Sequence, residues 1–279
     1  MYCDLHTHSV FSDGSFTPAQ LISHAKELNL TIALTDHNTV SGLPEFMAEA
    51  EKQGVTAVPG IEYSTQCRGR ELHLVGLFVA PEYYARLEQV AVEFRQLKTR
   101  SNQEMIARLA DAGYPLDYEA LRAKSPGGNI NRAHIAGAML EKGYVRSVQD
   151  AFERFLGEDR PFYVRTRHLE TAEAIRLLKE IGAVSVLAHP LKDLTEPQLR
   201  QILPELIDAG LDAMETHHSS YDDETIALAA QIVREFGLLP GGGSDFHGLA
   251  KPDIQLGTGK GNLRIPISFY ENLRTKCKE

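Results

Sequence analysis

Two histidines near the start of the chain, His6 and His8, are separated by a single residue. We expect this segment to form a short strand, and because side chains alternate along a strand, both rings would point to the same face. Neutral imidazole nitrogens are good ligands for transition metals, so the pair predicts a metal chelate. The alternative is a pair of solvated histidines. Asp13 follows between Ser12 and Gly14, where a turn is expected, and can direct its carboxylate toward a second cation.

Further histidines and carboxylates recur where other strands are expected to end. The complete set has six histidines and three carboxylates: His6, His8, Asp13, His37, Glu62, His73, His189, Asp245 and His247. These nitrogen and oxygen donors suit Zn, Mn or Fe(II) and do not suit a cysteine-rich structural zinc site. Nine ligands are too many for one ion and suffice for two or three ions with positions left for water. Such a cluster predicts hydrolysis, because bound ions lower the pKa of water and stabilise a displacement at phosphorus.

The elements that must position these residues alternate between strand and helix. After the first strand, strands are expected at residues 31–34, 55–58, 72–79, 184–188, 213–215 and 238–239. Helices are expected at residues 17–29, 41–53, 171–181, 196–209 and 222–236. This order is typical of parallel α/β folds, in which ligands collect at the carboxyl ends of the strands. Seven strands with polar ends predict a closed or nearly closed barrel, with an open sheet as the alternative, and the glycines at 241–243 indicate a close backbone approach.

The alternation stops from about residue 81 to about residue 161. Helices are expected there at residues 95–112, 118–123, 132–142 and 148–156, without a strong strand signal. We interpret residues 96–164 as a helical insertion over the sheet ends, between two parts of a barrel at 1–95 and 165–279. The alternative is a series of larger barrel helices.

Composition limits the class of protein and its partners. The chain has 279 residues with 43% hydrophobic and 24% charged content, as expected for one globular domain with or without an insertion. Its net charge of −9, from 38 acidic and 29 basic residues, argues against binding long nucleic acid such as DNA through a broad basic face. A small anionic substrate remains compatible, because bound divalent ions reverse the local charge.

The same features bear on location. No apolar run approaches the ~20 residues of a membrane span, so we expect no membrane association. No secretory signal is apparent, and a motif that begins at residue 4 leaves no room for a cleaved leader. Three cysteines without CxxC spacing fit a reducing compartment, and we expect a cytoplasmic protein without a structural disulfide.

Four segments resemble the motifs of the PHP (polymerase and histidinol phosphatase) family. They are Asp4-Leu5-His6-Thr7-His8-Ser9 with Ser12-Asp13-Gly14, then Thr35-Asp36-His37, Ala188-His189-Pro190 and Ser244-Asp245-Phe246-His247, in the family's order. The resemblance covers residues 1–95 and 165–250 and implies a distorted (β/α)7 barrel with a trinuclear site that often holds Mn, Fe or Zn. It assigns the ligands of the first ion as His6, His8, Glu62 and Asp245, of the second as Asp13, His37 and His247, and of the third as bridging Glu62 with His73 and His189.

The predicted insertion carries a second likeness. The segments Asn131-Arg132-Ala133-His134-Ile135-Ala136, Ala151-Phe152 and Phe155-Leu156-Gly157 resemble stand-alone PHP phosphoesterases, which act on nucleoside 3′,5′-bisphosphates and on 5′ ends of short RNA. Arg132 would bind substrate phosphate through its guanidinium, or is a surface arginine. His134 is a second contact or a packing histidine. Lys192, just after His189, stands where relatives place a basic residue, or is a solvated lysine.

Three further residues are candidates for the chemistry. His217 and His218 end an expected strand, where one can contact phosphate and the other protonate the leaving alkoxide. We assign the contact to His217 and the proton to His218, with no functional role as the alternative for each. Asp36, grouped with His218 among the catalytic candidates, either orients a ligand or bonds nearby backbone amides.

These observations predict a metal-dependent phosphoesterase. A hydroxide bridging two ions would attack phosphorus, while the third ion, Arg132 and Lys192 neutralise the phosphate oxygens. Cations outside the ligand set favour a substrate with a second anionic group, which a nucleoside bisphosphate or a short RNA carries. Histidinol phosphate carries an ammonium there, so a histidinol phosphatase is the less favoured enzyme. A non-catalytic nucleotide-binding PHP module is the other alternative, and the complete ligand set weighs against it.

Overall fold

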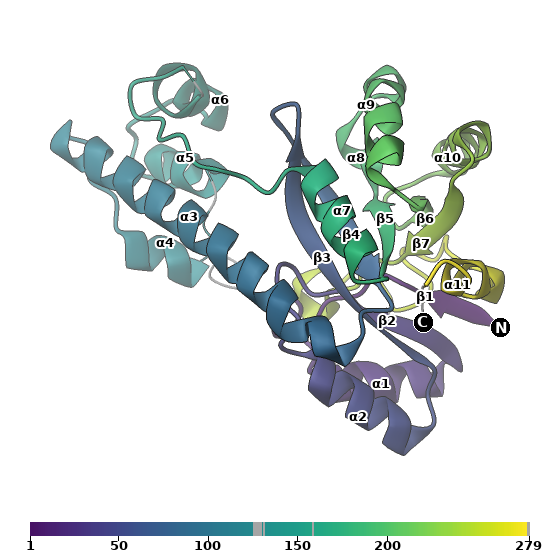
Figure 1. The fold of residues 1–279 in the computed structure, drawn as a ribbon. Coiled ribbons are helices and arrows are strands. Elements are labelled where there is room, and N and C mark those ends of the chain that lie inside the picture. The colour runs from purple at the N-terminus through teal and green to yellow at the C-terminus, as the bar shows by residue number, and fades with distance from the viewer. Residues whose placement is uncertain (125–129, 131, 158, 278–279) are drawn as a thin grey trace. The chain divides into compact units, whose positions relative to one another are not determined.

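A seven-stranded sheet forms the centre of the computed structural model, and its strands follow one another in chain order (Figure 1). The strands are β1 (Tyr2–Asp4), β2 (Leu30–Leu34), β3 (Ala57–Cys67), β4 (Arg70–Leu77), β5 (Val184–Ala188), β6 (Ala213–His218) and β7 (Leu239–Gly243). The structure describes residues 1–124, 130, 132–157 and 159–277. The first and last strands lie side by side. Leu5 N donates to Gly242 O at 3.3 Å, and Asp245 N donates to His6 O at 3.0 Å.

This contact confirms the predicted nearly closed barrel, and it explains the glycine run. A Cβ atom on Gly243 would collide with the side chain and backbone of His6, so only glycine lets the two strands approach. The interior below the carboxyl ends is filled by small and branched side chains, including Cys3, Val58, Val75 and Val186. The barrel is therefore a packed core rather than a pore.

The strands are not all parallel, which corrects the expected pattern. β3 and β4 pair antiparallel, as do β4 and β5, while the remaining neighbours are parallel. Cys67 pairs with Arg70, so only Arg68 and Gly69 separate the strands, and both have positive φ, at 51° and 75°. A two-residue loop of this conformation makes a hairpin, and a hairpin is antiparallel. The strand expected to end at residue 58 thus runs on to Cys67.

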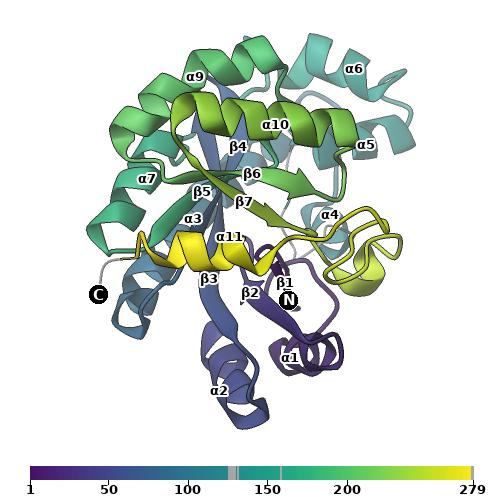
Figure 2. The same cartoon turned by 90° about the vertical axis from the view of Figure 1, so that its right-hand side faces the viewer.

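Helices surround this sheet. They are α1 (Pro18–Glu27), α2 (Leu43–Gln53), α7 (Thr171–Glu180), α8 (Pro190–Asp193), α9 (Glu196–Ala209), α10 (Asp223–Phe236) and α11 (Ile267–Arg274). Thr17 with Gln20 and Thr195 with Gln198 form capping boxes that start α1 and α9. α10 packs against β6 and α11 against β7 (Figure 2). None of the helices in the described ranges is both long and apolar enough to cross a membrane.

The chain forms two compact units, one of residues 1–91 with 169–279 and one of residues 92–168. α3 (Tyr84–Asp111) begins well before the predicted Arg95 and passes from the first unit into the second. The second unit continues with α4 (Tyr118–Lys124), α5 (Arg132–Glu141), α6 (Val148–Ala151) and a π-helical turn (Phe152–Leu156). Its own core includes Met105, Leu109, Ile135, Met139 and Phe155. The predicted insertion, residues 96–164, falls within this unit.

Candidate metal centre

Five histidine rings surround the fully buried carboxylate of Glu62. Three of them face Oε2: His37 Nδ1 at 2.9 Å, His6 Nε2 at 3.1 Å and His8 Nε2 at 3.2 Å. Two face Oε1: His73 Nδ1 at 2.9 Å and His189 Nε2 at 3.3 Å. Each carboxylate oxygen therefore serves its own group of nitrogens, which is the arrangement that a bridging ligand requires.

Two further carboxylates complete the cluster. His247 Nε2 lies 3.1 Å from Asp13 Oδ1, and His8 Nε2 lies 3.3 Å from Asp245 Oδ1. All nine predicted ligands fall into four overlapping groups whose donor atoms lie within 4.8 Å of one another. The groups are His8-Asp13-His37-His247, His6-Glu62-His189, His6-His8-Asp245 and His37-Glu62-His73.

The bonding state of these atoms tests whether metal ions fit. Several buried atoms have no hydrogen-bond partner among the described residues: His6 Nε2, both nitrogens of His8, His37 Nδ1, His73 Nδ1, His247 Nε2 and Glu62 Oε2. They lie close to carboxylate oxygens without the geometry of a hydrogen bond. An unsatisfied buried polar group costs ~1–3 kcal/mol, so a concentration of them demands an explanation. Lone pairs that converge on shared points fit divalent ions with nitrogen and oxygen ligands.

The first two histidines lie beyond β1, which ends at Asp4, so the expected strand was placed too far along the chain. The backbone nevertheless stays extended, because Thr35 N donates to Thr7 O and His8 N donates to Phe246 O, each at 2.9 Å. Alternation along this extended segment sends both rings to the same side, as predicted. Glu62 lies within β3 rather than after it, directly across from the core residue Val75 of β4.

Two of the candidate ligands have a left-handed backbone that residues other than glycine rarely adopt. φ is 31° at His189 and 57° at Asp245. Such conformations persist only where surrounding contacts hold them, and they concentrate at functional sites. At His189 the amide donates to Glu215 Oε2 at 2.7 Å, and at Asp245 the amide donates to His6 O. The turns that direct these side chains inward are thus tied to the cluster.

Glu215 on β6 was not predicted as a site residue. Its side chain is buried, and Oε1 lies 2.8 Å from His6 Nδ1. This contact fixes the ring so that His6 Nε2 faces Glu62, as carboxylates do behind metal-bound histidines. Burial raises the pKa of Glu215, but the charge and hydrogen bond of His6 outweigh burial and lower it. A carboxylate within an apolar strand is expensive unless paired, and this was the signal available in the sequence.

Asp4 is a second positioning carboxylate that the sequence reasoning missed. It accepts hydrogen bonds from Ser244 N at 2.8 Å, Ser244 Oγ at 2.6 Å and Gly257 N at 2.8 Å. Asp4, the last residue of β1, therefore ties the end of this strand to the segment that carries Asp245. Its position two residues before His6 was the local indication in the sequence.

Asp36 has the contacts of a positioning residue. It accepts from Ser9 N at 2.7 Å, and from Ser9 Oγ and Ser12 Oγ at 2.6 Å each. These bonds hold the turn that leads to Asp13 while His37, the next residue, joins the cluster. Of the two roles expected for Asp36, the bond from Ser9 N matches the one that binds a backbone amide, and a role in orienting a ligand stays a prediction.

A β-bulge precedes the two adjacent histidines of β6. The pairing with β7 shifts between Glu215 and His217, so that Glu215 and His218 both face the cluster although three residues apart. His218 Nε2 lies 3.5 Å from Asp245 Oδ2. His217 faces the other way and packs edge-on against Phe269 of α11, with ring centroids 5.2 Å apart. The structure thus places His218 at the site and the predicted phosphate contact His217 on the opposite face of β6.

Lys251 also reaches the cluster and was not predicted. Its Nζ lies 2.9 Å from Asp245 Oδ2, and its side chain is 36% exposed. Asp245 consequently presents Oδ1 to the neighbouring histidines other than His218, and it presents Oδ2 to His218 and Lys251. A lysine six residues after Asp245 in a loop carries no distinctive pattern, so the sequence offered no reason to select it.

The remaining predicted substrate residues are spread over both units. Lys192 is exposed on α8, immediately after His189 and Pro190. Arg132 and His134 lie on α5 of the second unit, where the Arg132 guanidinium packs 5.1 Å from the Tyr163 ring centroid. Asn131 lies outside the described residues. The roles of Arg132, His134 and Lys192 toward a substrate stay predictions.

A nearly closed α/β barrel with buried histidines and carboxylates at the carboxyl ends of its strands has the architecture of a metal-dependent hydrolase. Residues 4–159 match the family model described as the PHP domain. The chain belongs to the PHP domain family.

Three curated relatives are similar over most of their length. The 5′-3′ exoribonuclease Rnm of Salmonella typhimurium is 32% identical, over 91% of this chain and 87% of the relative. The phosphoribosyl 1,2-cyclic phosphate 1,2-diphosphodiesterase of Eggerthella lenta is 30% identical, over 88% and 94%. The 3′,5′-nucleoside bisphosphate phosphatase of Chromobacterium violaceum is 29% identical, over 88% and 86%.

A solved structure shares the fold. A Bifidobacterium adolescentis protein described as a metal-dependent phosphoesterase superposes with a TM-score of 0.72 at 27% identity, covering 99% of this chain and 96% of that chain. The likeness therefore extends over both units of the present chain.

Proposed function

We propose that this protein is a metal-dependent phosphoesterase that hydrolyses phosphate esters of small nucleotides, either nucleoside 3′,5′-bisphosphates or the 5′ ends of short RNA. The observation that carries the proposal is the buried cluster around Glu62, several of whose ring nitrogens lack hydrogen-bond partners among the described residues. The names of the relatives share a phosphate ester on a ribose, which supports this class of substrate.

We assign two or three divalent ions (Mn, Fe or Zn) to the cluster. His6, His8, Glu62 and Asp245 would hold one ion, Asp13, His37 and His247 a second, and Glu62 with His73 and His189 a third. The division of nitrogens between the two oxygens of Glu62 supports a bridging role. When bound, the ions supply a water of lowered pKa and charge that neutralises phosphate oxygens.

The protein's own groups orient the substrate and donate a hydrogen bond to its leaving oxygen. His218 Nδ1 accepts from Ser220 N at 3.2 Å, so the neutral ring carries its hydrogen on Nε2, the atom that faces Asp245. We assign to that hydrogen the interaction with the leaving oxygen of the ester. Lys251 adds a positive charge beside the same carboxylate, at the partly exposed side of the cluster. Lys192 and Arg132 are proposed contacts for other phosphate oxygens.

The cellular location belongs to the proposal as well. Cys3 and Cys67 are buried and form no disulfide in the structure, which supports a reducing, cytoplasmic compartment.

Metal analysis joined to a substrate comparison tests the function. We expect more than one ion per chain, and a higher kcat/KM for adenosine 3′,5′-bisphosphate or a 5′-phosphorylated short RNA than for 5′-AMP or histidinol phosphate. Asp13→Ala and His247→Ala are expected to abolish turnover while the far-ultraviolet circular dichroism spectrum is retained. At most one ion per chain in well-loaded protein would contradict the proposed multi-ion site. Histidinol phosphate as the best substrate would contradict the nucleotide substrate and leave the metal site unaffected.

A further inference from the structure

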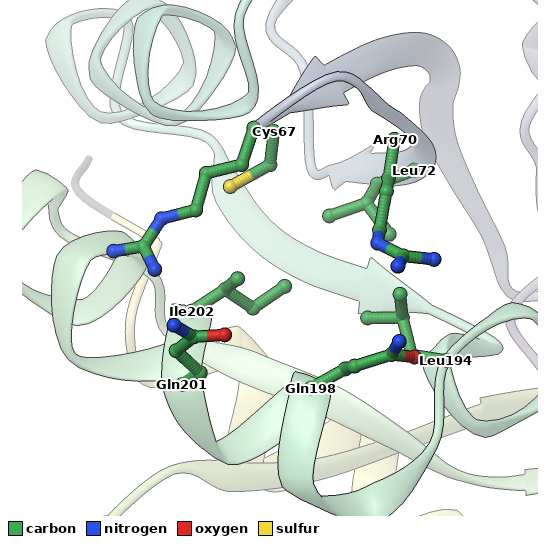
Figure 3. Close-up of a pocket in the computed structure, with 8 residues that line it drawn as sticks. Cys67, Arg70, Leu72, Leu194, Gln198, Gln201 and Ile202 are labelled. Carbon is green, nitrogen blue, oxygen red and sulfur yellow. The ribbon is translucent and has the colours of Figure 1, made fainter.

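A pocket of about 240 Å³ lies between the β3–β4 hairpin and α9 (Figure 3). Leu72 and Ile202 provide apolar surface, and Arg68, Arg70, Gln198 and Gln201 provide polar groups. Arg70 extends from the hairpin toward α9, which carries both glutamines (Figure 3). Apolar surface combined with guanidinium and amide groups suits a nucleotide, because bases pack against apolar surface while their edges and phosphates accept hydrogen bonds.

The strand register places this pocket at the metal end of the barrel. β4 runs antiparallel to β5 and pairs His73 with Ala188, the last residue of β5. Residues 70–72 therefore project past the carboxyl end of β5, on the side where His189 lies. Arg70 is three residues from His73, or ~10 Å along a strand, and faces the opposite side of the hairpin.

A short segment links the two sites. The metal-ligand candidate His189 is followed by α8 and then by Leu194, which lines the pocket. The exposed Lys192 stands on this segment between them. An oligonucleotide that leaves the cluster along α8 would thus meet Lys192 first and the pocket next. A mononucleotide with its phosphate in the cluster has a single nucleoside and no further nucleotide to place in the pocket.

The charges of the pocket leave one guanidinium available. Arg68 Nη2 forms an ion pair with Glu205 Oε2 at 3.2 Å, which offsets its charge. Arg70 is exposed, and within the described part of the chain it pairs with no carboxylate. One free cation in a small pocket is suited to a short nucleic acid and not to a long one, in agreement with the net charge of −9.

We propose that this pocket is a subsite for RNA. It binds a nucleotide downstream of the 5′ end while that end occupies the metal cluster, with the backbone phosphate on Arg70 and the base toward Gln198 and Gln201. The inference rests on the proposed phosphoesterase function and deepens it, because it makes short RNA the substrate that uses the most of this surface.

Charge reversal at Arg70 tests the subsite. The matched control is Arg234→Glu, because Arg234 is equally an exposed arginine but stands in the last turn of α10, at the opposite end of the barrel from the carboxyl ends of the strands. The first readout is anisotropy of a 5′-phosphorylated, 3′-fluorescein hexaribonucleotide with the metal-loaded full chain, its linkages made as phosphorothioates, which keep their charge and resist hydrolysis. The second is kcat/KM of the metal-loaded enzyme for the same hexamer with ordinary phosphodiester linkages and for adenosine 3′,5′-bisphosphate.

We expect Arg70→Glu to weaken hexamer binding and to lower its kcat/KM by about tenfold or more, since a charge-assisted contact becomes a repulsion. The bisphosphate values and both Arg234→Glu values stay within about twofold, as for remote surface changes. In Arg70→Ala the slope of log K against log salt becomes shallower by about 0.7, the value for one phosphate on a single strand.

The outcomes separate the subsite from the function. Equal hexamer binding by Arg70→Glu and the unmodified chain overturns the subsite, as does an equal loss in Arg234→Glu. If no phosphoester is turned over, the proposed function fails, and the anisotropy measurement still decides whether RNA binds here.

Discussion

The metal cluster and the hairpin pocket lie at the same end of the barrel and hold their charged groups in different ways. Each cluster histidine emerges from or beside a strand, and its surroundings include carboxylates such as Glu62, Glu215 or Asp245. Arg70 stands exposed near a two-residue loop, with one face toward solvent. Under the two proposals above, preorganised chemistry lies in the buried interior, where electrostatic interactions are strong, and substrate choice lies at the exposed rim.

The largest effect is expected from loosening the interior without removing a ligand. Glu215→Gln keeps the size of the side chain but weakens its bond to His6 Nδ1, so metal affinity and activity should fall by about 10- to 100-fold. Chelator competition measures the affinity, and Glu224→Gln, an exposed carboxylate on α10, is the control. Unchanged affinity in Glu215→Gln would show that the ring of His6 needs no orienting partner.

The second prediction concerns protons that compete with metal ions. Burial lowers the pKa of His8, but the adjacent carboxylates of Asp245 and Glu62 outweigh burial and raise the pKa to about 9. Burial likewise lowers the pKa of His73, but the charge of Glu62 outweighs it and raises the pKa to about 10. Both rings therefore hold protons at neutral pH until a metal ion displaces them.

Metal affinity should consequently rise with pH by about tenfold per unit for each proton released. Calorimetry of Mn²⁺ binding at pH 7.5 in buffers of different ionisation enthalpy counts these protons. In the metal-free protein, the protonated rings of His8 and His73 stabilise the fold through their neighbouring carboxylates, and this stabilisation is fully present below pH ~6.5. It is lost as pH rises through 9 to 10, where the two rings lose their protons. A metal-free Tm that increases from pH 7 to pH 10 would contradict the prediction.

The smallest effect is expected at the boundary between interior and rim. Lys251→Ala removes the cation beside Asp245 Oδ2 without touching a nitrogen ligand, and its partial exposure weakens its charge. We expect kcat/KM to fall by about three- to tenfold with metal content retained. Loss of an ion in this variant would instead show that Lys251 is needed for metal binding, as the interior residues are, and would contradict its place at the boundary.

The sequence by itself was sufficient to predict which histidines and carboxylates come together in the cluster. Histidines and carboxylates have no reason to recur at strand ends except chemistry, and each candidate could be recognised from local order alone: H-x-H, Asp13 in its turn, His189 before Pro190, and the pair Asp245 and His247. The seven-stranded barrel followed from the alternation of strand and helix, and the structure confirms it.

Only the tertiary structure decided how those residues are held. The hairpin made β4 antiparallel and placed Glu62 within β3, because a two-residue loop is a local feature with a non-local consequence. The bulge in β6 turned His218 inward and His217 outward, although the two residues are adjacent in sequence. Glu215 meets His6 across 209 residues of the chain and Asp4 meets Ser244 across 240, which no local pattern records, since the pairing of a buried charge depends on what folding brings beside it.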